Sequence, residues 1–404
     1  GRVSEPQEIL IAGGGPVGLV TGYALAKQGI PVTVFDENDE LQEDPRAATT
    51  HPATLELLGQ LGVIDQVIAQ GLVSPIFRFW DRPTGEMVAE FDHALLKDDT
   101  PYPFVVQCEQ FKLTHILLDL IAGLDNCEVK FSHRVTGLGV TADSVSVDVE
   151  TPGGSEKFTG RYLIGCDGGR SLVRKEMDID FEGFTWAERF LVLTTPFDFE
   201  AGRGMCYRNY IADPEEWCNC FKVAGDGPPG LWRTVYPADP DAPEESLMGD
   251  DFVQNKLQNF FPQGEDYDIV HRNLYTVHQR VAATFRKGPV LLAGDASHVN
   301  NSIGGMGLNG GIQDAMNLAE KLAQVWKGDA DESLLDRYDV QRRTYAKDYV
   351  QQQTIQNKKR LEAKDAQARK RSQDELRAMA ADPGKARAFM LKTSMIEAMR
   401  AIED

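Results

Sequence analysis

The sequence lacks the features that mark several common classes of protein. It contains no run of about 18 apolar residues, so we expect no transmembrane helix. Its six cysteines form no CxxC pair, and their irregular spacing favours free thiols in a reducing compartment. The seven histidines show no HxxxH or Cys/His spacing, which predicts no metal site. A GxSxG nucleophile motif is also absent.

Basic residues are also in short supply. Lysine and arginine together number 42 against 62 acidic residues, which gives a net charge of −20. This balance argues against nucleic acid and anionic membrane as partners. The opening residues, GRVSEPQEIL, have neither the basic nor the apolar region of a signal peptide, so we expect a cytoplasmic protein. With 404 residues, the chain is long enough for more than one small domain.

Glycine, by contrast, is plentiful and gathers in the segment from Gly288 to Leu322. We expect a buried strand from Val290 to Ala293, an acidic turn at Gly294 and Asp295, a glycine-rich loop, and an amphipathic helix. Backbone amides exposed before a helix N-terminus suit an anion or a polar ring edge. The loop contains Gly304, Gly305, Gly307, Gly310 and Gly311, followed in the helix by Ile312, Ala315 and Met316.

A second glycine motif lies near the N-terminus. An apolar strand, Glu8 to Ala12, leads into Gly13-Gly14-Gly15-Pro16-Val17-Gly18, and a helical stretch then runs to Gln28. A second strand, Pro31 to Phe35, ends at Asp36. In a βαβ unit of this kind the glycines allow close approach to a pyrophosphate, and the acid after the second strand binds ribose hydroxyls. The sequence therefore predicts a dinucleotide site.

A third segment, Tyr162 to Arg174, reads YLIGCDGGRSLVR, an apolar strand followed by Asp167-Gly168. With this segment the chain resembles the single-component FAD-dependent aromatic hydroxylases of the para-hydroxybenzoate hydroxylase type, over roughly residues 6 to 345. The glycine fingerprint, the "DG" motif at Asp167-Gly168 and the "GD" motif at Gly294-Asp295 occur in that family's order. The resemblance implies an α/β fold, with a Rossmann-like FAD-binding domain, an inserted mainly antiparallel sheet and a helical C-terminus.

The resemblance also implies the cofactor contacts. It puts Asp36 on the adenosine ribose, Asp295 on the ribityl chain, and Gly307 to Asn309 near the isoalloxazine. One departure is that no proline occurs between His298 and Ser302, where the family has one close to the substrate. The expected FAD-binding residues are Gly13, Gly15, Pro16, Val17, Gly18, Asp36, Glu37, Arg46, Gln107, Asp167, Arg174, Gly294, Asp295, Gly305, Gly307, Leu308 and Asn309.

Because the three motifs are far apart, the FAD-binding domain must be discontinuous. We assign residues 6–76, 102–180 and 270–345 to it. Residues 77–101 and 181–269 carry strand and turn signals and are assigned to a substrate-binding sheet. Residues 346–404 form a C-terminal helical segment, in which we expect a solvated helix up to a break at Asp382-Pro383-Gly384. The last helix docks on the body or on a second subunit, so the protein is a monomer or a homodimer.

The chemistry follows from the resemblance. NADH or NADPH reduces FAD, O2 adds to give a flavin C4a-hydroperoxide, and one oxygen atom passes to an activated phenolic or related aromatic ring. No second nucleotide fingerprint is present, so the nicotinamide binds without its own Rossmann unit. The acidic run from Glu37 to Asp44 disfavours the 2′-phosphate of NADPH.

Candidate residues for the substrate end come from two regions. A base near neutral pH suits histidine, and His51, five residues after Arg46, is the first candidate, with His298 as the second. Since side chains alternate along a strand, about half of the candidates in the 190–236 sheet must face away from the flavin. Arg208, Lys222 or Arg233 is suited to hold a substrate carboxylate. The sheet candidates are Tyr207, Arg208, Tyr210, Lys222, Trp232, Arg233 and Tyr236.

Three alternatives stay open at this point. The substrate can be a polycyclic or N-heteroaromatic ring instead of a simple phenol. A flavin-dependent halogenase shares the FAD fold, but its WxWxIP motif does not occur here. A non-catalytic flavoprotein would bind FAD without substrate-stimulated oxygen uptake.

Overall fold

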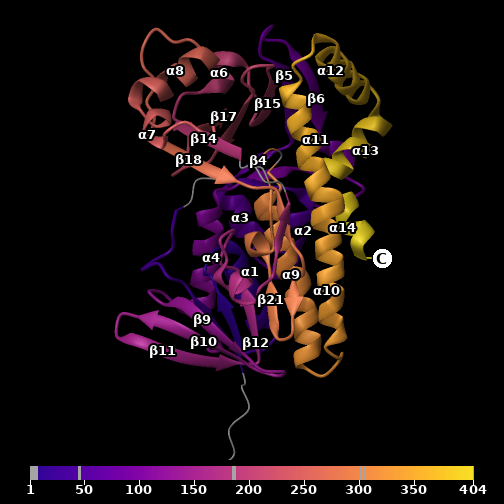
Figure 1. Cartoon of the computed structure of the whole chain (residues 1–404). Helices are drawn as coiled ribbons and strands as arrows, with labels where there is room; N and C mark the ends of the chain where they lie inside the picture. The colour runs from indigo at the N-terminus through magenta and orange to yellow at the C-terminus, as the bar shows by residue number, and fades with distance from the viewer. Residues whose placement is uncertain (1–7, 44–46, 184–187, 301–302, 304, 404) are drawn as a thin grey trace, which may run out of the picture.

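The computed structural model describes residues 8–43, 47–183, 188–300, 303 and 305–403. Two main sheets lie one beyond the other, and a row of C-terminal helices runs along the side of both (Figure 1). Strands β1, β12 and β21 belong to the sheet in the lower half of Figure 1, and β14, β17 and β5 to the sheet in the upper half. The α/β fold class expected from the sequence is confirmed.

The first sheet has six strands in the order β20-β21-β12-β1-β2-β8, all parallel except β20. Apolar runs without polar alternation form its centre because both faces are covered, and all four residues of β1 are buried. Helix α1 (Pro16–Lys27) begins with a proline at its first turn and packs between α4 and α9. The strands are β1 (Ile9–Ala12), β2 (Val32–Phe35), β8 (Cys127–Lys130), β12 (Tyr162–Gly165), β20 (Arg286–Lys287) and β21 (Val290–Leu292).

The second sheet has seven strands in the order β18-β14-β17-β16-β15-β5-β6. One face packs on α6 (Phe199–Arg203) and α8 (Asp250–Phe260) through Phe199, Val253 and Leu257. Strand β18 pairs with β14, so the expected domain boundary at residue 270 is wrong and this strand belongs to the second sheet. The strands are β5 (Ile76–Asp81), β6 (Met87–Asp92), β14 (Glu188–Thr195), β15 (Arg208–Ala212), β16 (Cys218–Val223), β17 (Leu231–Ala238) and β18 (His271–Val277).

Three small sheets and several short helices complete the body. The small sheets are β11-β10-β9, β13-β19-β22 and β3-β7-β4. Their strands are β3 (Thr49–Thr50), β4 (Leu72–Ser74), β7 (Val105–Gln107), β9 (Arg134–Val140), β10 (Val145–Thr151), β11 (Gly154–Gly160), β13 (Phe181–Gly183), β19 (Arg280–Ala282) and β22 (His298–Val299). The helices are α2 (Pro52–Leu61), α3 (Ile64–Gln70), η1 (His93–Leu96), α4 (Gln110–Ala122), α5 (Leu172–Glu176), α7 (Glu244–Leu247), η2 (Gly294–Ala296) and α9 (Gly307–Trp326).

The C-terminal helices are packed on the body, which corrects the expectation of a solvated helix. Leu361 and Leu376 are buried in a core shared with the second sheet. Arg369 binds the buried carboxylate of Asp81 through two hydrogen bonds of 3.0 and 2.8 Å. The predicted break is confirmed, because Asp382 caps the next helix. The segment comprises α10 (Ser333–Thr344), the π-helical turn η3 (Tyr345–Val350), α11 (Gln351–Glu362), α12 (Ala366–Ala381), α13 (Pro383–Thr393) and α14 (Ile396–Glu403).

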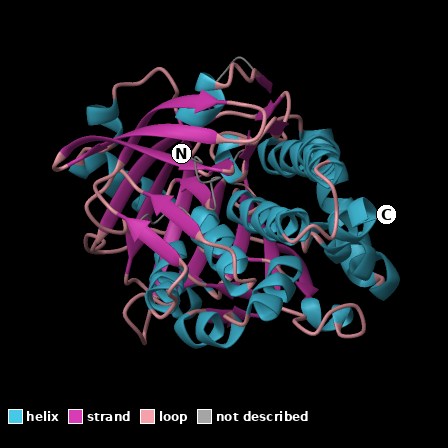
Figure 2. Ribbon diagram, turned by 90° about the horizontal axis from the view of Figure 1, so that it is seen from below, coloured by secondary structure: helices cyan, strands magenta, loops and turns pink. Residues whose placement is uncertain are grey.

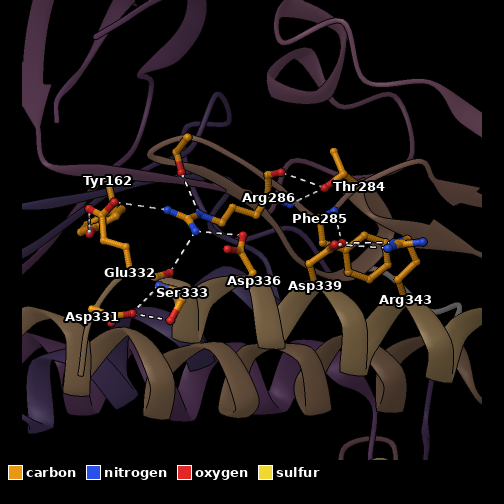
Figure 3. A network of polar contacts seen from close by, with 11 residues as sticks. Tyr162, Thr284, Phe285, Arg286, Asp331, Glu332, Ser333, Asp336, Asp339 and Arg343 are labelled. Atoms are coloured by element: carbon orange, nitrogen blue, oxygen red, sulfur yellow. Dashed lines mark hydrogen bonds and ion pairs between the residues drawn. The ribbon is translucent and has the colours of Figure 1, made fainter. Parts of the chain in front are cut away.

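Helix α10 is tied to the edge of the first sheet by a polar network around Arg286 (Figure 3). The Arg286 guanidinium donates to the backbone oxygen of Glu332 and to the Asp336 carboxylate, each at 2.9 Å. Asp339 accepts from the backbone N–H of Phe285 at 2.7 Å. Seen from below in Figure 2, the helices enclose the strands on several sides. Within the described residues, no helix combines the length and the apolar character needed to cross a membrane.

Candidate active site

A large cavity of about 1270 Å³ collects the three sequence motifs. Its walls come from the ends of β1, β2 and β12, from the turn after β21, and from the N-terminus of α9. Because parallel strands end at the same edge of a sheet, segments far apart in the sequence meet here. On its other side the cavity reaches the second sheet through Arg208, Tyr210, Asn219, Phe221 and Val235.

The first motif makes a close-packed turn with one open side. A Cβ atom on Gly13, whose φ is +107°, would lie 2.2 Å from the backbone oxygen of Cys166. A Cβ atom on Gly18 would lie 1.8 Å from the backbone oxygen of Gly13. Gly15 instead has nothing within 4 Å of its Cβ position and lines the cavity, as do Pro16 and Val17. Gly13 and Gly18 therefore serve packing, and Gly15 leaves room for a ligand.

Asp36 lies at the end of β2, on the wall of the cavity. Its Oδ2 atom accepts from the backbone N–H of Gly14 at 2.9 Å, and its Oδ1 atom accepts from Asn38 at 2.8 Å. These bonds fix the carboxylate beside the glycine turn. Glu37, the next residue, is exposed and also lines the cavity.

The Asp167-Gly168 motif joins two loops. Asp167 accepts from the backbone N–H groups of Leu172 and Val173 at 2.9 and 3.2 Å, and so caps α5. Burial raises the pKa of Asp167, although these hydrogen bonds oppose the shift. Arg174 donates to the backbone oxygens of Ala296 and Gly169 at 3.0 and 2.8 Å. Both side chains line the cavity, but their polar contacts mainly hold the loops in place.

Beside this motif, the turn after β21 is held by a buried ionic network that sequence reasoning missed. Asp314, on α9, accepts from the backbone N–H of Gly294 at 3.0 Å and lies 2.7 Å from Nε2 of His298. Its other oxygen accepts from Nε of Arg342 at 2.6 Å. Burial raises the pKa of Asp314, but the charges of His298 and Arg342 outweigh it and the net shift is downward. Asp295, two residues before Ser297, is exposed and lines the cavity.

The start of α9 and the two residues before it face the cavity with Gly305, Met306, Gly307 and Leu308. A Cβ atom on Gly307 would meet nothing within 4 Å, so the helix N-terminus is open on this side. Asn309 is buried and is not a lining residue: it donates to the backbone oxygen of Thr49 at 2.8 Å and accepts from the His51 N–H at 2.9 Å. The positive end of the helix dipole therefore points at the cavity.

His51 and Gln107 do not reach the cavity wall. His51 precedes Pro52, which holds it in an extended conformation at the N-cap of α2, and its side chain is fully buried. Gln107 is also fully buried and donates to the backbone oxygen of Tyr207 at 3.4 Å. Gly18 and Gly294 lie behind the wall as well. Arg46 and Gly304 lie outside the described residues.

The alternation of the second sheet divides the substrate candidates. Arg208 and Tyr210 face the cavity, and the register places Arg233 in the same cross-strand row as Arg208. Trp232 and Tyr236 are buried on the other face, against α6 and α8, and Tyr207 packs on that cluster. Lys222 is paired with Trp232 and its Nζ atom lies 4.9 Å from the centre of the Tyr207 ring. The expectation that these four residues line the cavity is therefore wrong, because the strand period of two turns them away.

Cations gather at the cavity although the whole chain is acidic. Six basic side chains line it against four carboxylates, and His278, near Arg280, has a pKa lowered by burial and by the charges of Arg280 and Arg170. Sequence reasoning named Arg174 and Arg208 but missed the group as a whole, because its members come from four separate segments. The basic residues are Arg134, Arg170, Arg174, Lys175, Arg208 and Arg280, and the acids are Asp36, Glu37, Asp167 and Asp295. Among the described residues, no cluster of three or more His, Cys, Asp or Glu side chains could hold a metal ion.

Residues 7–353 match the model of a protein family described as FAD binding domain. The chain belongs to this family. Para-nitrophenol 4-monooxygenase from Pseudomonas sp. (strain WBC-3) is 32% identical over 98% of the chain and 97% of that protein. A 6-hydroxy-3-succinoylpyridine 3-monooxygenase from Pseudomonas putida (strain DSM 28022 / S16) is 35% identical over 84% of the chain and 85% of that protein.

The fold agrees with the same family. The crystal structure of p-nitrophenol 4-monooxygenase from Pseudomonas putida DLL-E4 superposes with a TM-score of 0.91 at 30% identity, covering 98% of this chain and 99% of that one. The protein is an FAD-dependent aromatic monooxygenase, as the three motifs predicted. The open Cβ positions of Gly15 and Gly307, both on the cavity wall, leave room for a dinucleotide.

Proposed function

We propose that this FAD-binding-domain protein uses NADH and O2 to hydroxylate a small phenolic ring, bound between the α9 N-terminus and the second sheet. One observation carries the proposal: a single cavity joins the dinucleotide motifs to a sheet face with a buried arginine and a tyrosine. By their names, the similar proteins act on a nitrophenol and on a hydroxypyridine, whose single rings have the size of a phenol ring.

The chain's residues hold the cofactor and exclude water. Gly15 and Gly307 leave room for it, Asp36 offers its carboxylate at the end of β2, and Asp295 does so beside η2. When bound, FAD supplies the redox and oxygen chemistry. The remaining proposed FAD contacts are the lining residues Gly13, Pro16, Val17, Glu37, Asp167, Arg174, Gly305 and Leu308, with Gly18, Gln107, Gly294 and Asn309 acting from behind the wall.

Proton transfer is assigned to Tyr210. Its hydroxyl oxygen accepts from Nε of Arg208 at 2.9 Å, which leaves its own proton to donate or exchange with a substrate hydroxyl. His51, the first candidate from the sequence, is fully buried and does not line the cavity. We assign His51 a positioning role, since its N–H holds Asn309 in the first turn of α9.

The reductant approaches along the cationic group of Arg170, Lys175 and Arg280, which suits its pyrophosphate. The acidic run after Asp36 opposes an additional 2′-phosphate, so NADH is the proposed electron donor.

Purified protein tests the proposal directly. We expect FAD to copurify at about one per chain, and a panel of phenols, aromatic acids and N-heterocycles to contain a member that accelerates NADH oxidation and yields a hydroxylated product. Absence of flavin, or a panel in which no compound is hydroxylated, would refute the function. A clear preference for NADPH would refute the choice of reductant only.

A further inference from the structure

A second, small cavity of about 20 Å³ lies on the C-terminal side of Arg208 and Tyr210. Arg208, Tyr210 and Met306 line both cavities, so the two cavities meet at these residues. The rest of the small cavity is built from β5 and from the C-terminal helices α11 and α13. Its other lining residues are Phe77, Phe79, Ile303, Gln353, Asn357, Arg360, Leu361, Phe389 and Thr393.

The small cavity is cationic although its surroundings are apolar. Arg208 is only 4% exposed, its guanidinium lies 4.7 Å from the centre of the Phe77 ring, and its Nη1 atom has no hydrogen-bond partner among the described residues. Arg360 stacks on Phe389 at 5.4 Å. No carboxylate within the described part of the chain forms an ion pair with either arginine.

Burial lowers the pKa of Arg360, and the charge of the exposed Glu375 partly offsets this shift. Burial, and then the charge of Arg208, lower the pKa of His93 to about 4, so this histidine is neutral near pH 7 and adds no second positive charge beside Arg208. A buried cation without an anion costs free energy, and a ligand that brings negative oxygen atoms removes this cost.

We propose that the small cavity binds a substituent of the aromatic substrate that carries negatively polarised oxygens, such as a carboxylate or nitro group, with Arg208 and Arg360 as its cations. This assignment rests on the proposed function, since the ring itself occupies the main cavity. A volume of about 20 Å³ holds roughly one water-sized group, so it admits the oxygen end of a substituent and excludes a second ring.

The walls supplied by α11 and α13 lie almost entirely beyond residue 353, where the match to the family model ends. Asn357, Arg360 and Phe389 are among these residues. The family's FAD-binding part is therefore completed here by side chains that the family model does not cover. This gives the C-terminal helices a role in substrate choice, in addition to their role in packing.

The test measures binding to the FAD-loaded protein without reductant, by the change in flavin absorbance. The probes are the three hydroxybenzoates and the three nitrophenols, compared with the three methylphenols, which have the same ring and a neutral apolar substituent. We expect the best oxygen-bearing probe to bind at least about tenfold more tightly than the corresponding methylphenol. If no hydroxybenzoate or nitrophenol binds more tightly than its methylphenol, including the case where none binds, the assignment is wrong.

Two variants locate the effect. Arg360→Met should lower that preference about tenfold and leave methylphenol binding and FAD content unchanged. Arg208→Met should also lower the preference, which checks the other side of the small cavity, but it removes the donor to the Tyr210 hydroxyl as well. Arg387→Gln is the matched control: it removes one positive charge from α13, where Arg387 pairs with Asp99 outside both cavities. Retention of the full preference by both methionine variants, or an equal loss in Arg387→Gln, contradicts the proposal; loss of FAD or of hydroxylation would instead bear on the proposed function.

Discussion

Two buried arginines, one in each half of the molecule, differ in a way that separates structure from function. Arg342 is fully buried near the flavin end, and Asp314, Gly310 and the ring of Tyr345 surround its guanidinium. Arg208 is almost as buried in the second sheet, but its guanidinium contacts the Tyr210 hydroxyl and the aromatic rings of Phe77 and Tyr210. A buried cation with its own carboxylate belongs to the scaffold, whereas one without a carboxylate is available to a ligand.

The largest expected effect comes from removing the carboxylate of the first arginine. Asp314→Asn leaves Arg342 buried without a counter-charge and loosens the N–H of Gly294, so we expect a loss of about 3–5 kcal/mol in unfolding free energy and of FAD retention. Urea unfolding and bound-flavin absorbance measure both. Asp336→Asn is the control, because the Asp336 carboxylate is largely exposed and its loss should change stability by less than about 1 kcal/mol. Equal losses in the two variants would show that the buried Asp314 carboxylate stabilises the protein no more than the exposed Asp336 carboxylate does.

A second effect is the loss of stability at acidic pH that we expect from His93, which lies near Arg208. Burial first and the Arg208 charge second lower the pKa of His93 from 6.5 to about 4. The unfolded chain therefore takes up a proton that the folded chain refuses, so stability is full above the unfolded pKa and falls as the pH drops toward 4. The loss reaches about 3 kcal/mol.

His93→Gln should remove this acid-dependent loss. Unfolding free energies of wild type and variant at about pH 7 and about pH 4.5 give the comparison, since other groups titrate equally in both. His271→Gln, at an exposed position on β18, provides a matched change elsewhere. An acid sensitivity that stays the same in His93→Gln would show that His93 does not cause it.

The contrast between the flavin end and the second sheet also explains what could be predicted from the sequence. The flavin end was readable because Gly13, Asp36 and Asp295 follow apolar strands, and the ligand demands those residue types at that spacing. Asp314 and Arg342 were missed because an ion pair between two helices has no local pattern. For the second sheet, alternation could predict only that about half of the candidate side chains face the cavity. Which half it is depends on strand register, which decides whether Arg208 or Trp232 points inward. The role of α11 and α13 was hidden for a further reason: a polar helix appears solvated until its partner is known.

The smallest expected change in stability is that of Arg208→Met, compared with the same substitution at Arg342. Arg208→Met removes a buried guanidinium that has no carboxylate partner, so no buried charge is left uncompensated and the unfolding free energy should change by less than about 1 kcal/mol, or rise. Arg342→Met removes the same group but leaves the Asp314 charge buried beside His298 only, and should cost about 3–5 kcal/mol. Urea unfolding of the two variants measures the difference. A large loss in Arg208→Met would mean that this arginine supports the fold as Arg342 does. A stable Arg208→Met protein would instead show that the cation is kept at its buried position for a ligand, because the folded chain gains nothing from it.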